Sequence, residues 1–124
     1  MKFEFPKDYK LSSFSLLLSE VDLVNNWKHE PIKRLLIEPN KGFIIIHKVD
    51  FCPVKRHSHP WVVDLVYVVP EFRRKGLGKA MLEFLVTKGF EITCVAEPAY
   101  VQFYKHIGFE NVAERQGCQI FQKP

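Results

Sequence analysis

Long hydrophobic runs are absent from this chain of 124 residues. No apolar stretch approaches the roughly 20 residues that span a bilayer, so we expect no membrane-spanning helix. The first residues lack the layout of a signal peptide, because Asp8 and several serines interrupt any hydrophobic stretch. Cysteine is also scarce, and Cys52, Cys94 and Cys118 form neither an even framework nor a close pair. This pattern indicates a reducing, cytoplasmic compartment.

Extreme charge is absent as well. The formal net charge is +4, and 47% of the residues are hydrophobic, which is typical of a globular domain rather than a disordered chain. The length predicts a single domain over residues 1–124 with a hydrophobic core. A modest positive charge suits a polyanionic ligand or an ordinary basic surface, and no clear nucleic-acid signature is visible. A monomer and a homodimer both remain open.

Residues 65–80 carry the strongest motif. A β-branched strand runs into a proline, then a basic loop, then a Gly-x-Gly at the start of a helix. Unpaired N–H groups at a helix N-terminus attract anions, and glycines let the main chain approach a bound group closely. Formal positive charge is added by Arg73, Arg74, Lys75 and Lys79. The stretch therefore predicts a phosphate or pyrophosphate site.

Two common phosphate-binding motifs do not fit this stretch. A P-loop needs Ser or Thr after Gly-Lys, but Ala80 follows Lys79. A dinucleotide fingerprint needs a third glycine three residues after the second, and Met81 stands there. The pattern that remains is Arg-x-x-Gly-x-Gly at residues 73–78. It follows the Val-Val-Pro of residues 68–70 at the end of the strand, with Glu71 and Phe72 between them.

This pattern resembles the acyl-CoA motif of the GNAT superfamily of N-acyltransferases, in which Arg or Gln, two residues, Gly, one residue and Gly or Ala follow a strand ending Val-x-Pro. A second stretch, Phe-Tyr-Lys-His-Ile-Gly-Phe at residues 103–109, is similar to the family's Phe-Tyr-x-x-x-Gly-Phe. The resemblance is specific over residues 61–110. It implies an α/β fold of the GNAT type, with a central, mostly antiparallel mixed sheet and helices on both faces. It also implies acetyl-CoA as cosubstrate and no metal.

Periodicity and turn residues predict the element order. The N-terminal half contains a helix over 12–24 and a hairpin of strands 34–38 and 43–49. The rest contains a central strand at 61–69, a helix at 78–88 closed by Gly89, a strand at 90–96, a helix at 98–107 and a hairpin pairing 109–113 with 118–122. Only residues 2–5 could supply a strand before the first helix, so the N-terminal half looks abbreviated.

The resemblance implies where the cofactor binds. The pantetheine would lie as a pseudo-strand along the central strand, with amides that bind it and polarise the thioester carbonyl at Val66, Tyr67 and Val68. Such preorganised donors are worth roughly 3–4 kcal/mol each in acyl transfer. The pyrophosphate would be held mainly by backbone N–H groups in the loop formed by Arg73, Arg74, Lys75, Gly76, Leu77, Gly78 and Lys79.

Tyr104 matches the family tyrosine that donates a proton to the departing sulfur. A phenol with a pKa near ~10 is protonated at neutral pH and suits that role. The alternative is a core aromatic residue. The family often has Asn seven residues before this tyrosine, touching the pantetheine, and Glu97 replaces it here. We therefore do not expect that contact.

Asp64 is the candidate general base, because it is the one carboxylate within the apolar strand 61–69. Glu71 and Glu97 compete with it, and a structural, hydrogen-bonded carboxylate is an equal alternative. Burial would raise its pKa toward a useful value. In the absence of a bulge, alternation places it on the face shared by Val62, Val66 and Val68.

Other reactive residues fit ordinary roles better. His57 and His59 form a His-x-His without a third metal ligand nearby, so a solvated loop is favoured over a metal site or a contact with substrate. Cys94 lies on an alternating apolar face, so a core thiol is favoured over a nucleophile paired with His106.

These features predict an N-acetyltransferase that moves an acetyl group from acetyl-CoA to a primary amine by direct attack in a ternary complex. The acceptor, a small molecule or a peptide, is not identified by any motif. The alternative is a non-catalytic acyl-CoA-binding or protein-interaction module on the same fold, favoured by the abbreviated N-terminal half and by Glu97.

Overall fold

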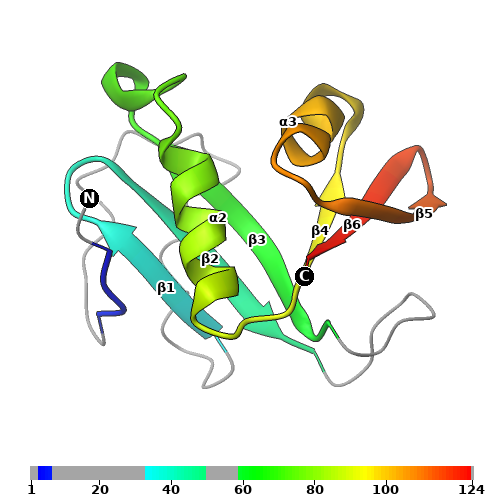
Figure 1. The fold of residues 1–124 in the computed structure, drawn as a ribbon, viewed down its shortest axis with the longest axis horizontal. Coiled ribbons are helices and arrows are strands. Elements are labelled where there is room, and N and C mark those ends of the chain that lie inside the picture. The colour runs from blue at the N-terminus through cyan, green and yellow to red at the C-terminus, as the bar shows by residue number, and fades with distance from the viewer. Residues whose placement is uncertain (1–2, 7–32, 50–58, 124) are drawn as a thin grey trace.

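The protein is described by a computed structural model that covers residues 3–6, 33–49 and 59–123. Within these residues, six strands form one mixed sheet in the order β1-β2-β3-β4-β6-β5 (Figure 1). The strands are β1 (Lys33–Glu38), β2 (Gly42–Lys48), β3 (Trp61–Val68), β4 (Ile92–Ala96), β5 (Glu110–Arg115) and β6 (Cys118–Lys123). The helices are η2 (Pro70–Phe72), α2 (Leu77–Thr87), η3 (Pro98–Tyr100) and α3 (Val101–His106). The helix expected at 12–24 and most of the 50–60 loop lie outside the described residues.

The hairpin of β1 and β2 confirms the sequence prediction. Its turn contains Asn40 at a positive φ of 65°, a conformation that Asn tolerates better than most residues. Gly42 opens β2, where a Cβ atom would lie 2.6 Å from the carbonyl oxygen of Tyr67. The close approach of β2 to β3 therefore needs glycine at this position. The segment at residues 3–6 adds one antiparallel bridge, with both backbone hydrogen bonds between Glu4 and Ile37 at 2.9 Å.

A bulge interrupts the pairing of β2 with β3. Ile45 lies opposite Leu65, but Ile46 lies opposite Val63, so Asp64 is an extra residue on β3. One extra residue reverses the alternation of side chains and amides along the rest of a strand. For each residue of β3 after Asp64, the bulge therefore decides on which face of the sheet the side chain lies and toward which side of the strand the amide points.

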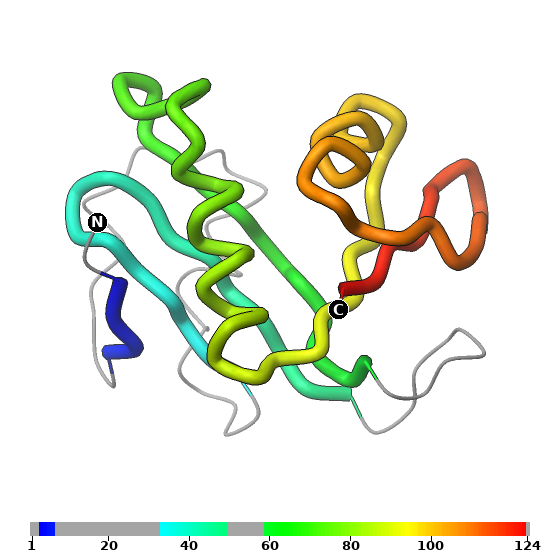
Figure 2. The backbone as a smooth tube through the Cα atoms, viewed as in Figure 1, coloured from blue at the N-terminus to red at the C-terminus, as the bar shows by residue number. Residues whose placement is uncertain are grey.

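The pairing of β3 with β4 is short. It is parallel and comprises only Trp61 opposite Ile92 and Val62 opposite Thr93. Beyond these pairs the two strands diverge, as Figure 2 shows for the green and yellow segments. Although β3 is central, most of its residues are only half-buried, and Tyr67 is its one buried residue. The divergence leaves one side of the upper part of β3 without a strand partner among the described residues.

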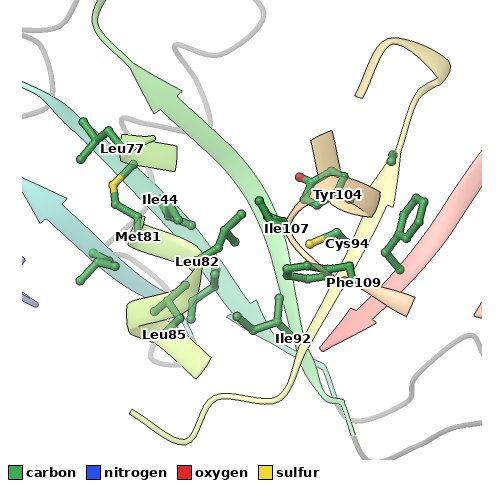
Figure 3. Close-up of a cluster of buried hydrophobic side chains, with 14 of the residues drawn as sticks. Ile44, Leu77, Met81, Leu82, Leu85, Ile92, Cys94, Tyr104, Ile107 and Phe109 are labelled. Carbon is green, nitrogen blue, oxygen red and sulfur yellow. The ribbon is translucent and has the colours of Figure 1, made fainter. Parts of the chain in front are cut away.

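Both described α-helices cover the same face of the sheet. Leu82 of α2 and Tyr104 of α3 belong to one buried cluster with Ile44 of β2 and Cys94 of β4 (Figure 3). This confirms the mixed α/β sheet, whereas helical cover on the second face lies outside what the described residues test. A second buried cluster occupies that face, formed by Leu35, Ile37, Phe43, Ile45 and Tyr67.

The C-terminal half also follows the sequence prediction in outline. Gly89, after α2, has the positive φ of 94° expected of a residue that ends a helix. The predicted helix at 98–107 is divided into η3 and α3. The last hairpin forms as predicted, and Gln116 and Gly117 both have positive φ in its turn.

Candidate functional site

The loop between β3 and α2 presents backbone amides at its C-terminal end. Gly76 precedes α2 at a φ of 80°, the left-handed region that favours glycine, and no side chain of the described residues caps the amides of the first turn. No acidic residue lies in that turn either. The N-terminus of an 11-residue helix therefore keeps its partial positive charge available for an anion.

Exposed cations surround these amides. Arg73, Arg74 and Lys75 lie in the loop and Lys79 in the first turn of α2, and all four are exposed. The Nε of Arg73 donates a hydrogen bond of 2.8 Å to the carbonyl oxygen of Val68, which holds this cation at the end of β3. The strand end, the loop and the helix start thus bring positive charge and free amides together, as the sequence predicts for a pyrophosphate.

Successive amides of β3 point to opposite sides of the strand, and one hydrogen bond shows which amides point toward β2. The Val69 N–H donates to the Lys41 carbonyl at 2.8 Å, on the β2 side. Alternation therefore turns the amides of Val66 and Val68 away from β2, toward the region where β3 and β4 diverge. The amide of Tyr67 faces β2, so of the three residues expected to contact pantetheine only two direct an amide to the open side.

The bulge at Asp64 is responsible for this arrangement. The Trp61 N–H donates to the Glu91 carbonyl next to β4 at 3.3 Å, so odd-numbered residues face β4 at the start of β3. Without the extra residue, Leu65 and Tyr67 would direct their amides to the open side. Because of the bulge, the amides of Val66 and Val68 point to the open side instead.

Tyr104 lies beside this region, on α3. Its ring is packed between Phe109 at 5.5 Å and Phe121 at 5.8 Å between ring centroids. Figure 3 shows the ring extending from α3 beside Cys94. Burial raises the pKa of Tyr104 well above its ordinary value, and the charge of a neighbouring Cys94 thiolate would raise it further. The phenol therefore stays protonated at neutral pH, which both a proton donor and a core residue require.

Cys94 is fully buried on β4, as predicted for a core thiol. Burial raises the pKa of this thiol far above its usual value, and the interaction with Tyr104 lowers it only in part. A thiol that stays protonated is a poor nucleophile. Its place in the apolar cluster therefore agrees with a packing role.

Asp64 pairs with a residue that the sequence prediction does not include. Its Oδ1 lies 2.7 Å from Nδ1 of His47 on β2, and its second oxygen is buried without a hydrogen-bond partner in the described structure. The prediction that Asp64 shares a face with Val62, Val66 and Val68 is correct for Val62 only. Asp64 contacts His47, which lies opposite Val62, whereas Val66 packs into the cluster under the helices. The bulge is the reason.

His47 belongs to a row of residues that cross the sheet directly opposite one another, on the face away from α2. The Oγ1 of Thr93 donates to the His59 carbonyl at 2.9 Å and accepts from Nε2 of Gln122 at 3.2 Å. This face is therefore polar at the level where the pairing of β3 with β4 ends. The row consists of Lys33, His47, Val62, Thr93, Gln122 and Glu110.

The remaining candidates are resolved in part. The solvated-loop interpretation is wrong for His59, which is only 5% exposed and whose carbonyl accepts the hydrogen bond from Thr93. His57 lies outside the described residues. Within residues 3–6, 33–49 and 59–123, no group of three His, Cys, Asp or Glu residues could hold a metal ion. Glu71 and Glu97 are both exposed.

The comparison with family models decides the identity of the fold. A model described as an acetyltransferase (GNAT) domain matches residues 38–111, more than half of the chain. The chain belongs to the GNAT family. The match includes β3, the basic loop and Tyr104, which agrees with the motif resemblance. No curated protein sequence matches the chain.

Solved structures of GNAT proteins share the fold at low identity. The N-acetyltransferase YlbP of Bacillus subtilis, solved with coenzyme A, has a TM-score of 0.67 and 11% identity, and the match covers 98% of this chain and 95% of that one. A Desulfovibrio desulfuricans protein assigned to the GNAT family has a TM-score of 0.66 and 15% identity, with coverage of 98% and 95%. The aminoglycoside N-acetyltransferase AAC(6')-Iy, also solved with CoA, has a TM-score of 0.60 and 17% identity over 78% and 82%.

Sequence reasoning alone missed His47. It lies near the end of an apolar strand and 17 positions before Asp64, so spacing gives no signal. Only the antiparallel register of β2 and β3, together with the bulge, brings its imidazole to Asp64.

Proposed function

We propose that this GNAT protein transfers an acetyl group from acetyl-CoA to a primary amine by direct attack in a ternary complex. The observation that carries the proposal is the open side of β3, with the amides of Val66 and Val68 directed toward it and the uncapped start of α2 beyond its end. Strand amides without a partner strand among the described residues match an extended pantetheine, and the basic loop matches its pyrophosphate.

The chemistry follows from these groups. The amide of Val66 would donate to the thioester carbonyl and stabilise the oxyanion that forms on attack. Tyr104 would give its proton to the departing sulfur. The apolar neighbours of Tyr104 keep its phenol neutral until that step. Asp64 would assist deprotonation of the acceptor.

Two findings support a CoA thioester as the donor. The family model names an acetyltransferase, and two of the solved structures with the same fold are described in complex with CoA. Two free cysteines among the described residues, Cys94 and Cys118, agree with a reducing, cytoplasmic location, which we propose as well. No described helix is long and apolar enough to cross a membrane.

A second candidate function is acyl-CoA binding without turnover. It is favoured by Glu97, which is exposed at the position where the family often carries Asn. Calorimetric titration with acetyl-CoA tests the shared part of both proposals, and the absence of binding would contradict both. Release of free CoA thiol in the presence of an amine panel separates them, because only the transferase releases thiol in proportion to the amine added.

A further inference from the structure

We infer that His47 is the general base for the acceptor amine and that Asp64 positions it. This inference rests on the proposed acetyl transfer and identifies the group that makes the acceptor reactive. An alkylammonium ion, with a pKa of ~10.4, cannot attack a thioester until it loses a proton.

The contact between the two side chains defines the base. Nδ1 of His47 lies 2.7 Å from Oδ1 of Asp64, which is short enough for a strong hydrogen bond from Nδ1–H to the carboxylate. A neutral imidazole that donates from Nδ1 carries its free lone pair on Nε2. The carboxylate therefore fixes the tautomer in which Nε2 accepts a proton.

Exposure assigns different roles to the two residues. The His47 side chain is 26% exposed and the Asp64 side chain 16% exposed. Asp64 is bound on one oxygen by His47, and its other oxygen is buried. The imidazole is the more accessible of the two, so it is the one that an amine or a bridging water can reach.

The position along the sheet brings the pair near the reactive carbonyl. Asp64 precedes Val66 by two residues, which corresponds to roughly 7 Å of strand. A reacting carbonyl, the attacking nitrogen and one bridging water span that length. Asp64 lies on β3 just beyond the last pair with β4, so its strand borders the opening, and His47 contacts it from the neighbouring strand β2.

The side of the sheet agrees with the direction of attack. Tyr104 belongs to the cluster under α2 and α3, whereas His47 and Asp64 lie on the opposite face. The nitrogen attacks the carbonyl carbon from outside the plane that contains the sulfur. The group that accepts its proton therefore belongs on a different side of the thioester from the group that protonates the sulfur.

The proton balance of the reaction closes with these residues. The ammonium gives one proton to Nε2 of His47, which later releases it to solvent. The neutral nitrogen forms the new C–N bond, and the C–S bond breaks as the tetrahedral intermediate collapses. Tyr104 protonates the sulfur, and the second proton lost by nitrogen restores the phenol. One amide, one free CoA thiol and one proton result.

The test compares two kinds of acceptor in one His47→Ala variant. Butylamine and lysine amide are ammonium ions at neutral pH and need a base, whereas hydroxylamine is largely neutral there and does not. We expect kcat with the alkylamines to fall about 10²–10⁴-fold while kcat with hydroxylamine changes only a few fold. Added imidazole should restore part of the alkylamine rate. His106→Ala, which removes an exposed imidazole on α3, is the matched control and should leave all rates unchanged.

Asp64→Asn tests the positioning role in the same assay. It should lower kcat with the alkylamines without changing the affinity for acetyl-CoA, because the amide no longer fixes the imidazole tautomer. Circular dichroism and thermal unfolding confirm that each variant is folded. An equal loss with both kinds of acceptor, or full alkylamine activity in His47→Ala, overturns the inference and leaves the proposed function intact. If the wild type acetylates neither kind of acceptor, the proposed function fails, and the inference fails with it.

Discussion

The two faces of the sheet differ sharply where β3 and β4 separate. Under α2 and α3 the face is apolar and tightly packed, with Cys94 and Tyr104 among its buried residues. On the opposite face a polar row begins at Lys33 and His47 and continues through Thr93. The Tyr104 phenol is buried and keeps its proton, whereas the His47 side chain is 26% exposed and reaches solvent. The proposed proton donor Tyr104 and the proposed proton acceptor His47 would thus lie in different environments, on opposite faces of the sheet.

The largest expected effect comes from the apolar face. Tyr104→Phe should lower the turnover of acetyl-CoA about 10²–10⁴-fold, because it removes the proton donor to the sulfur while the ring still packs against Phe109 and Phe121. Steady-state thiol release, together with calorimetry for acetyl-CoA affinity, measures this. Tyr100→Phe, at a residue 58% exposed, is the matched control. Unchanged turnover in Tyr104→Phe would mean that Tyr104 is a packing residue only.

The second largest effect concerns the open side of β3. Val66→Pro removes an amide that faces away from β2, so we expect a folded protein whose turnover falls about 10²–10³-fold, the usual cost of losing one oxyanion donor. Leu65→Pro removes an amide on the β2 side and should instead unfold the sheet. Thermal unfolding and thiol release are measured on both variants. Equal stability of the two would contradict the assigned amide directions.

A smaller effect is expected at the end of β3. Arg73→Ala should weaken acetyl-CoA binding about tenfold, because it removes a cation that the Val68 carbonyl holds beside the start of α2. Calorimetry at low and high salt measures the loss, which should shrink as salt screens the charge. Arg115→Ala, at an exposed arginine that is the last residue of β5, controls for net charge. Equal affinities of the two variants would show that the loop does not hold the pyrophosphate.

The smallest effect concerns alkaline stability. The pKa values of Cys94 and Tyr104 are raised in the folded protein, first of all by burial, so their stabilising contribution is complete below the pKa values of the unfolded chain. Those values are about 8.5 for Cys and about 10 for Tyr. Above them the unfolded state loses protons that the folded state keeps, and the free energy of unfolding should fall by up to about 1.4 kcal/mol per pH unit for each group.

Urea unfolding of the wild type and of Cys94→Ala between pH 7 and 10 measures this dependence. The variant should show the flatter profile over the lower part of this range, because Cys94 begins to ionise in the unfolded chain at a lower pH than Tyr104. Parallel profiles would indicate that the thiol of Cys94 ionises in the folded protein. Because burial also raises the pKa of Tyr104, its phenol should stay protonated in mild alkali, and any loss of activity there should have another origin.

The local parts of the molecule were predictable from sequence. The turn at Asn40, the glycine after α2 and the turn at Gly117 each depend on residues that tolerate positive φ, and such preferences act within a few residues. The basic loop and the start of α2 follow from the same kind of local signal, which is why the motif of residues 73–78 predicted the turn into the helix, with Gly76 at a positive φ of 80° before Leu77.

What tertiary structure alone decided is the orientation of β3 and the partner of Asp64. One extra residue moves every later side chain of the strand to the other face of the sheet and turns every later amide to the other side. The residues at the bulge do not predict it from sequence. The pairing of His47 with Asp64 joins residues 17 positions apart, and the separation of β3 from β4 follows a crossover through α2. The sequence therefore determined that the chain has a GNAT fold with a basic, glycine-containing loop before α2. Long-range register determined which groups face the open side of β3, because strand pairing depends on contacts that no local pattern contains.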